Sequence, residues 1–115
     1  MKLKIFSMSF KVKTISVFER QAKRLMKKFP SLKKEIQYLI KELREEPENG
    51  TSIGHSCYKI RLAIASKGKG KSGGARVITH FVFKDDTVYL LTIYDKSDIE
   101  NITDKDILEL IKLIP

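Results

Sequence analysis

The chain has 115 residues, of which 42% are hydrophobic, and its 23 Lys and Arg against 14 Asp and Glu give a formal net charge of +9. This length and apolar content suit one compact domain and exclude a generally disordered chain, and no apolar run approaches the roughly 20 residues that span a bilayer. The charge favours a polyanionic partner: nucleic acid, an anionic membrane surface or an acidic protein.

The N-terminal residues precede a first predicted strand. Residues 1–7 lack the long apolar core and the clear cleavage site of a signal peptide, and Met8 offers an alternative start. We therefore expect a single domain within residues 1–115, with residues 1–9 as a disordered extension to it. Apolar residues alternate with lysines from Phe10 to Ile15, which predicts a short strand.

Two amphipathic helices are predicted after this strand. Ser16 and Glu19 form an S-x-x-E capping box, and apolar residues at helical spacing predict a helix from Val17 to Phe29. Pro30 ends this helix, and the same spacing predicts a second helix from Leu32 to Glu46. Because their connection is very short, we expect the helices to form an antiparallel hairpin.

The second half of the chain contains three predicted strands. After a loop over 48–55, apolar and basic residues alternate from Tyr58 to Ala65, which indicates a strand with one buried face and one basic face. β-Branched and aromatic residues predict further strands at Arg76–Phe83 and Val88–Tyr94, joined by a tight turn at 84–87. Consecutive strands joined in this way form an antiparallel meander.

A capped helix is predicted at the C-terminus. Thr103 with Asp106 resembles a capping box, and apolar residues from Ile107 to Ile114 predict the helix itself. The predicted element order is therefore β-α-α-β-β-β-α. We expect an α+β fold in which the helical hairpin and the last helix pack on an antiparallel sheet.

The loop KGKGKSGGAR, at residues 67–76, contains a Gly-Lys-Ser triplet like the end of a phosphate-binding P-loop. A P-loop needs another glycine five residues before its last one, where this chain has Ala65, and a helix after the Lys-Ser pair, where this chain has a predicted strand. A nucleotide site is therefore disfavoured. A nucleic-acid contact and a flexible hairpin loop both stay open.

Basic residues gather on the predicted middle strands. Lys59 and Arg61 are two positions apart, so both project from one face of their strand, Arg76 opens the next strand, and Lys96 follows the last one. Such a cluster suits RNA cleavage without a metal or cofactor, in which a 2′-hydroxyl is held in line, charge on the phosphorane is stabilised and protons are moved. Arginine gives bidentate phosphate contacts, and a lysine crowded by cations has a lowered pKa. A solvated basic face without catalysis fits the same charges.

Three other residues are weaker candidates. The single Cys57 excludes an internal disulfide framework, fits a reducing cytoplasm and is expected to be a small buried strand residue. His80 alternates with apolar strand residues, which favours a structural role over a catalytic one. Tyr94, beside Lys96 at a strand end, is a candidate for stacking on a nucleobase, and packing explains it nearly as well.

Several segments together resemble the RelE/ParE superfamily of bacterial toxins. These are CYKIRL at 57–62, KGKGKSGGARV at 67–77 and LLTIYDKS at 90–97, with supporting residues from Phe18 to Lys33. The likeness covers roughly 10–114, and the Lys-Gly-rich loop resembles the HigB-like branch. The resemblance implies a RelE-like fold and the toxin of a type II toxin–antitoxin pair in the cytoplasm.

This resemblance also implies an activity and a set of partners. RelE-like toxins enter the ribosomal A site and cut mRNA during translation, so an mRNA interferase with the ribosome and mRNA as partners, and no membrane, is implied. A cognate antitoxin, often with a helix-turn-helix DNA-binding domain, neutralises such a toxin.

Roles for four basic residues follow from the same resemblance. Lys59 and Arg61 match the basic strand pair that positions the substrate and assists deprotonation. Arg76 matches the arginine that stabilises the phosphate. Lys96 falls where the family often has a basic residue that acts on the leaving group.

Further RNA contacts are expected at a tyrosine and in the loop. A tyrosine that many RelE toxins carry near the last helix would fall at Ile102 and is missing, so we take Tyr94 as its substitute. The loop lysines are expected to contact ribosomal or messenger RNA on a mobile arm whose glycines allow close backbone approach. These lysines are Lys67, Lys69 and Lys71.

Two alternative functions stay open. One is a ParE-like toxin that binds DNA gyrase, and the other is a basic nucleic-acid-binding protein without catalysis. Retention of Lys59, Arg61, Arg76 and Lys96 argues against the gyrase inhibitor, which would not need these residues.

Overall fold

The computed structural model describes residues 9–68, 70, 73–98 and 101–115, so all but Ser9 of the expected N-terminal extension lies outside the described residues. Its elements are β1 (Lys11–Thr14), α1 (Ser16–Lys28), α2 (Leu32–Glu45), β2 (Thr51–Gly54), β3 (Cys57–Leu62), β4 (Ala75–Val82), β5 (Thr87–Asp95) and α3 (Asp104–Ile111). The order matches the predicted one except for one additional strand, β2.

The strands form one sheet in the order β1-β5-β4-β3-β2. β3, β4 and β5 make the predicted antiparallel meander, and β2 pairs antiparallel with β3. β1 instead pairs parallel with β5, where Val12 lies opposite Val88, so the sheet is mixed and the expectation of a purely antiparallel sheet is corrected at this edge. The two helices after β1 supply the long connection that a parallel pair requires.

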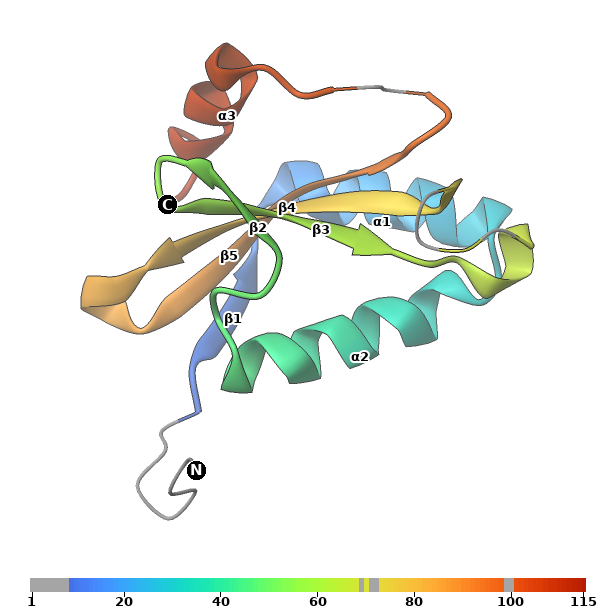
Figure 1. Ribbon diagram of the computed structural model, residues 1–115, viewed down its shortest axis with the longest axis horizontal. Coiled ribbons are helices and arrows are strands. Elements are labelled where there is room, and N and C mark those ends of the chain that lie inside the picture. Colours follow the sequence, from blue (N-terminus) through green and yellow to red (C-terminus); the bar gives the residue numbers. More distant parts are fainter. Residues whose placement is uncertain (1–8, 69, 71–72, 99–100) are drawn as a thin grey trace.

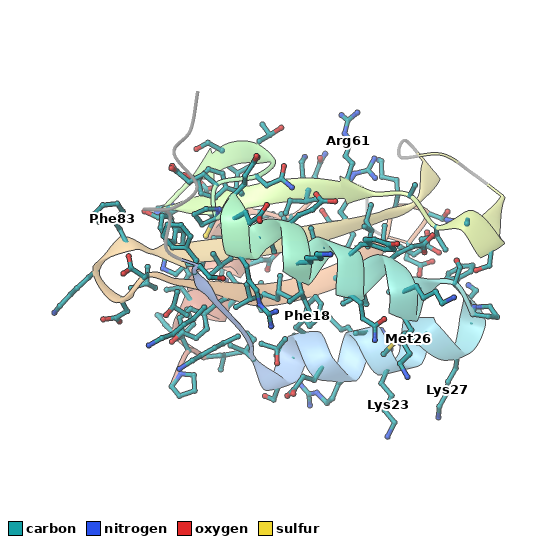
Figure 2. The ribbon with its side chains drawn as sticks, turned by 90° about the horizontal axis from the view of Figure 1, so that it is seen from below. Phe18, Lys23, Met26, Lys27, Arg61 and Phe83 are labelled. Carbon is teal, nitrogen blue, oxygen red and sulfur yellow. The ribbon has the colours of Figure 1, made fainter. Side chains whose placement is uncertain are left out.

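Helices cover both faces of this sheet (Figure 1). α2 lies on one side of the sheet and α3 on the other, while α1 packs against β5. Figure 2 shows α1 and α2 side by side and antiparallel, as expected for the helical hairpin. No helix in the described part of the chain is long and apolar enough to cross a bilayer. The helical side chains buried against the sheet are Phe18, Ala22 and Leu25 in α1, Leu32, Ile36, Leu39 and Leu43 in α2, and Ile107 in α3.

The two predicted capping boxes have different outcomes. The box at Ser16 is wrong, because the N-cap of α1 is Ile15 and Ser16 is already helical. The Ile15 side chain is buried in the core and its amide donates to the carbonyl of Leu90 at 3.3 Å, so β1 runs directly into the helix. The box of α3 is confirmed, because the Asp106 amide donates to Thr103 Oγ1 at 3.1 Å and the Thr103 amide donates to Asp106 Oδ2 at 3.3 Å.

The segment 48–55, expected to be a loop, contains β2. This short edge strand exposes most of its side chains, so it lacks the alternation that marks a half-buried strand. It turns into β3 through His55 and Ser56, which both have φ of 56°, in the left-handed region that two-residue hairpin turns use. β3 also ends earlier than predicted, at Leu62, and Ala65–Lys67 forms one turn of 3-10 helix.

Candidate functional site

Arg61, Arg76 and Tyr94 form one row across three neighbouring strands. Arg61 in β3 is the direct partner of Arg76 in β4, which is in turn the direct partner of Tyr94 in β5. Directly opposed residues of antiparallel strands project to the same face, so these side chains share one face of the sheet. Lys59, two residues before Arg61, projects from the same face. The register thus gathers three of the four predicted catalytic residues.

The two arginines of this row differ in exposure. Arg61 is exposed, and Figure 2 shows it extending from β3 away from the rest of the molecule. Arg76 is only 5% exposed, and its Nη1 donates to the carbonyl of Ala75 at 3.1 Å. Like charges opposite each other on a sheet destabilise it, so an anion between them is favourable. One fixed and one extended guanidinium suit a phosphate group, which arginine binds through two parallel hydrogen bonds.

Lys96 lies in the turn that follows β5. Its amide donates to the carbonyl of Gly74 at 3.0 Å, and the preceding Asp95 is the strand partner of Ala75. The fourth predicted catalytic residue is therefore held beside the start of β4, next to the strand position of Arg76. The Lys96 side chain is partly exposed.

Tyr94 lines a cavity of about 300 Å³ between β5 and α3. The tyrosine is 5% exposed, and its burial raises the pKa of the phenol, while the charge of Arg76 lowers it in part. Ile102, where the resemblance expects a tyrosine, lines the same cavity with Leu110 and Leu113. The candidate for base stacking is thus a cavity wall and not an exposed platform. Strand and helix patterns gave no sign of this cavity, because α3 forms it by packing across the sheet.

Of the three loop lysines, the structure describes Lys67 alone, because Lys69 and Lys71 lie outside the described residues. Lys67 differs from the expected exposed contact, because its side chain is 13% exposed and its Nζ donates to Asp95 Oδ1 at 2.5 Å and to Ser97 Oγ at 3.0 Å. The buried carboxylate of Asp95 thus holds this ammonium group inside the protein.

The end of the loop is fixed by a close backbone approach. A Cβ on Gly74 would lie 2.1 Å from the carbonyl oxygen of Leu62, whereas one on Gly70 would meet nothing within 4 Å. The glycine at 74 therefore lets the loop return against β3. β4 begins at the next residue, Ala75, so the strand expected where a P-loop would have a helix is present.

Cys57 and His80 lie at the other end of β3 and β4. They are direct strand partners, and Cys57 Sγ lies 3.4 Å from His80 Nδ1. Burial raises the pKa of the Cys57 thiol to about 11 and lowers the pKa of His80. A thiol with a raised pKa is a poor nucleophile, in line with a structural role for both residues. Among the residues that the structure describes, no group of three His, Cys, Asp or Glu side chains is arranged to hold a metal ion.

Sequence reasoning missed Asp95 and Gln21. Asp95 is 3% exposed, and the only signal for it was an acid placed directly after an apolar strand. Gln21 Oε1 accepts hydrogen bonds from Thr92 Oγ1 at 2.6 Å and from the Ile93 amide at 3.1 Å. Gln21 thereby accepts hydrogen bonds from β5 at positions beyond the end of β1. A single glutamine in an amphipathic helix gives no signal for such a contact.

Comparisons with known proteins agree with this fold. A family model for the RelE toxin of the RelE/RelB toxin–antitoxin system matches residues 10–114. A double arginine-to-alanine mutant of the E. coli toxin RelE in the free state matches with a TM-score of 0.58 and 18% identity, over 94% of this chain and 100% of that chain. The toxin–antitoxin complex RelBE2 from Mycobacterium tuberculosis matches with a TM-score of 0.56 and 15% identity, over 79% of this chain and 95% of that chain. At these identities the two structures bear on the fold alone.

Proposed function

Since the chain belongs to the RelE family of toxins from toxin–antitoxin systems, we propose that it is a ribosome-dependent mRNA endonuclease. The observation that carries this proposal is the direct cross-strand pairing of Arg61 with Arg76. This pair, with Lys59 on the same face, offers two guanidinium groups and an ammonium to one phosphodiester. Such preorganised charge is worth most at a phosphorane, where negative charge develops.

The proposed reaction is an internal attack by the RNA on itself. The 2′-oxygen bonds to phosphorus while the bond to the 5′-oxygen breaks, which leaves a 2′,3′-cyclic phosphate and a 5′-hydroxyl. Lys59 and Arg61 position the substrate and assist removal of the 2′-hydroxyl proton, and Arg76 stabilises the phosphorane. Lys96 supplies a proton to the departing 5′-oxygen.

Further contacts are proposed along the bound message. The Tyr94 ring, adjacent to Arg76 in the strand register and 5% exposed, is assigned to support Arg76 from the cavity wall and not to stack on a nucleobase. Lys69 and Lys71 are assigned to RNA contacts through the loop that resembles the HigB-like branch.

The proposed partners are the ribosome, its mRNA and a cognate antitoxin with a helix-turn-helix domain, all in the cytoplasm. The antitoxin is supported by family membership, and the RelBE2 relative is itself a toxin–antitoxin complex. A gene for a small helix-turn-helix protein beside this one would support the same pairing.

Primer extension across a translated message in bacteria tests the proposal. The wild type should produce cuts inside the reading frame that depend on translation. Arg61→Ala and Arg76→Ala should each reduce cleavage by about 10²–10³-fold, as loss of one charge-stabilising donor does. Arg44→Ala, which removes an exposed arginine from the last turn of α2, should cut like the wild type.

Two outcomes would contradict the endonuclease. Growth arrest with intact mRNA would favour gyrase inhibition, and absence of arrest would favour a binding protein without catalysis. Circular dichroism of each purified variant separates lost catalysis from lost fold. Arg61→Ala is the more informative variant, because the exposed Arg61 leaves no gap in the core.

A further inference from the structure

The ion pair between Lys67 and Asp95 joins the loop after β3 to the end of β5. The exposed fractions are 13% for Lys67 and 3% for Asp95, so the pair lies largely inside the protein. A buried carboxylate that loses its partner is unfavourable, and Lys67 is therefore needed wherever Asp95 stays charged.

Asp95 also holds the turn that carries Lys96. Its Oδ1 accepts a hydrogen bond at 2.9 Å from the amide of Ser97, the residue that follows Lys96. The Lys96 amide itself donates to the carbonyl of Gly74 at 3.0 Å. The backbone of Lys96 is thus fixed on both sides, and one of these contacts ends on the carboxylate that Lys67 neutralises.

Asp95 also pairs with the residue that precedes Arg76 in β4. Asp95 is the direct partner of Ala75, and the carbonyl of Ala75 accepts a hydrogen bond from Arg76 Nη1 at 3.1 Å. A shift of the β5 end would therefore move the group against which the Arg76 guanidinium is oriented.

Lys67 is held in place by the junction between α1 and α2. The Ser66 amide donates to Ser31 Oγ at 2.9 Å, and the Ala65 amide donates to Glu35 Oε2 at 2.8 Å. Lys67 Nζ also lies 5.8 Å from the ring centroid of Phe29. These contacts fix the short turn that carries Lys67. Its ammonium group therefore connects the junction of the two helices to Asp95 at the end of β5.

We propose that the Lys67–Asp95 ion pair positions Lys96 and Arg76 for phosphodiester cleavage, so that Lys67 acts as a positioning residue and not as an RNA contact. The assignment rests on the proposed endonuclease function. It predicts that loss of either partner slows the cleavage step and leaves the affinity for the ribosome unchanged.

Single-turnover cleavage of mRNA on programmed ribosomes, with the toxin in excess, separates these quantities. Lys67→Met and Asp95→Asn should each lower the saturating rate by on the order of 10–100-fold, since a displacement of about 1 Å costs up to 10² in rate. The half-saturating concentration should stay within about twofold. Lys67→Arg, which keeps the charge, should recover most of the rate. The double variant, Lys67→Met with Asp95→Asn, should be no slower than the slower single variant, because the two residues act as a unit.

Lys28→Met is the matched control. Lys28 Nζ also lies over the Phe29 ring, 5.4 Å from its centroid, so this variant removes a lysine from the same ring without touching the Asp95 carboxylate. It should cut at the wild-type rate. Thermal unfolding of every variant shows whether it is folded at the assay temperature. If Lys67→Met unfolds, the double variant, which leaves no unpaired charge buried, still tests the assignment.

The results that would overturn the assignment are distinct. If Lys67 contacts RNA directly, Lys67→Met raises the half-saturating concentration and lowers the salt slope of binding by about one, while Asp95→Asn cuts normally. Full activity in both single variants would equally overturn it. A folded wild type that cuts no translated message would overturn the proposed function and this assignment with it.

Discussion

Arg61 and Asp95 are both charged residues at strand positions, and they have different roles. Arg61 is exposed and lies opposite Arg76, so two like charges face each other across β3 and β4. Asp95 is buried and neutralised by Lys67, an arrangement that favours the folded chain. Removing one partner of a buried pair typically costs about 3–5 kcal/mol, so each of these two residues matters for stability as well as for position.

The acid stability of the protein should depend on Asp95. Burial alone raises the pKa of Asp95, but hydrogen bonds from Lys67 and from Ser97 outweigh it and leave the pKa below its ordinary value. A carboxyl whose pKa is lowered on folding stabilises the protein above its ordinary pKa of about 3.9, and this contribution is lost as the pH falls through the lowered value. The difference in unfolding free energy between wild type and Asp95→Asn should therefore shrink below about pH 4.

Urea unfolding from neutral pH down to about pH 2 measures this difference. Glu109→Gln is the control, because Glu109 lies 3.4 Å from Lys112 in a pair that is mostly exposed, and exposed pairs contribute little. Parallel stability curves for wild type and Asp95→Asn over the whole range would contradict the expected role of the carboxylate.

Residue spacing was enough to predict part of the site. Lys59 and Arg61 share a face because they lie two apart on a strand, and this follows from sequence alone. The pair of Lys67 with Asp95 joins residues 28 positions apart, and it depends on how the loop folds back over α1 and α2. No local pattern reports such a contact, so the sequence led to the expectation that Lys67 contacts RNA.

The connection between β3 and β4 is the element on which the site most depends. Its first turn is tied to the helices, and its last residue, Gly74, lies against the backbone of Leu62. The added Cβ in Gly74→Ala would lie 2.1 Å from the Leu62 carbonyl oxygen, so the backbone must move. We expect this variant to lose about 1–3 kcal/mol of unfolding free energy.

Gly70→Ala tests whether this loss comes from the close approach. Nothing lies within 4 Å of a Cβ at position 70, so chemical denaturation should show a stability close to that of the wild type. Equal losses in both variants would show that general stiffening of the loop, and not the Leu62 contact, is responsible.

Elements with a strong period were predictable, and those defined by pairing were not. The helices and the strands of the meander carry 3.6- or 2-residue patterns because each buries one face. β2 pairs at the edge, exposes most of its side chains and turns through His55–Ser56 in place of an Asn-Gly pair, so its signals were absent. The direction of β1 depends on which strand it pairs with. Its alternating residues are compatible with both parallel and antiparallel pairing.

The molecule as a whole carries positive charge on more than one side. Figure 2 shows Lys23 and Lys27 of α1 projecting on the opposite side of the molecule from Arg61. A net charge of +9 spread in this way favours association with RNA over a wide surface. Ribosome binding should therefore weaken steeply with salt, by on the order of a thousandfold between roughly 50 and 200 mM if about six phosphates are contacted.

Binding to ribosomes measured across this salt range checks the expectation. A nearly flat dependence would contradict binding to phosphates over a wide basic surface. The same titration with naked RNA supplies the sequence-independent part of the slope.

The facing arginines of β3 and β4 also bear on how easily the activity can be lost. Arg61 lies outside the core, and its replacement by a neutral residue removes a like-charge repulsion from the sheet. A chain that has lost this residue should keep its fold. Under the proposed function, selection against toxicity therefore has a short route to a folded, inactive descendant that still binds an antitoxin, and the gene can persist after its activity is lost.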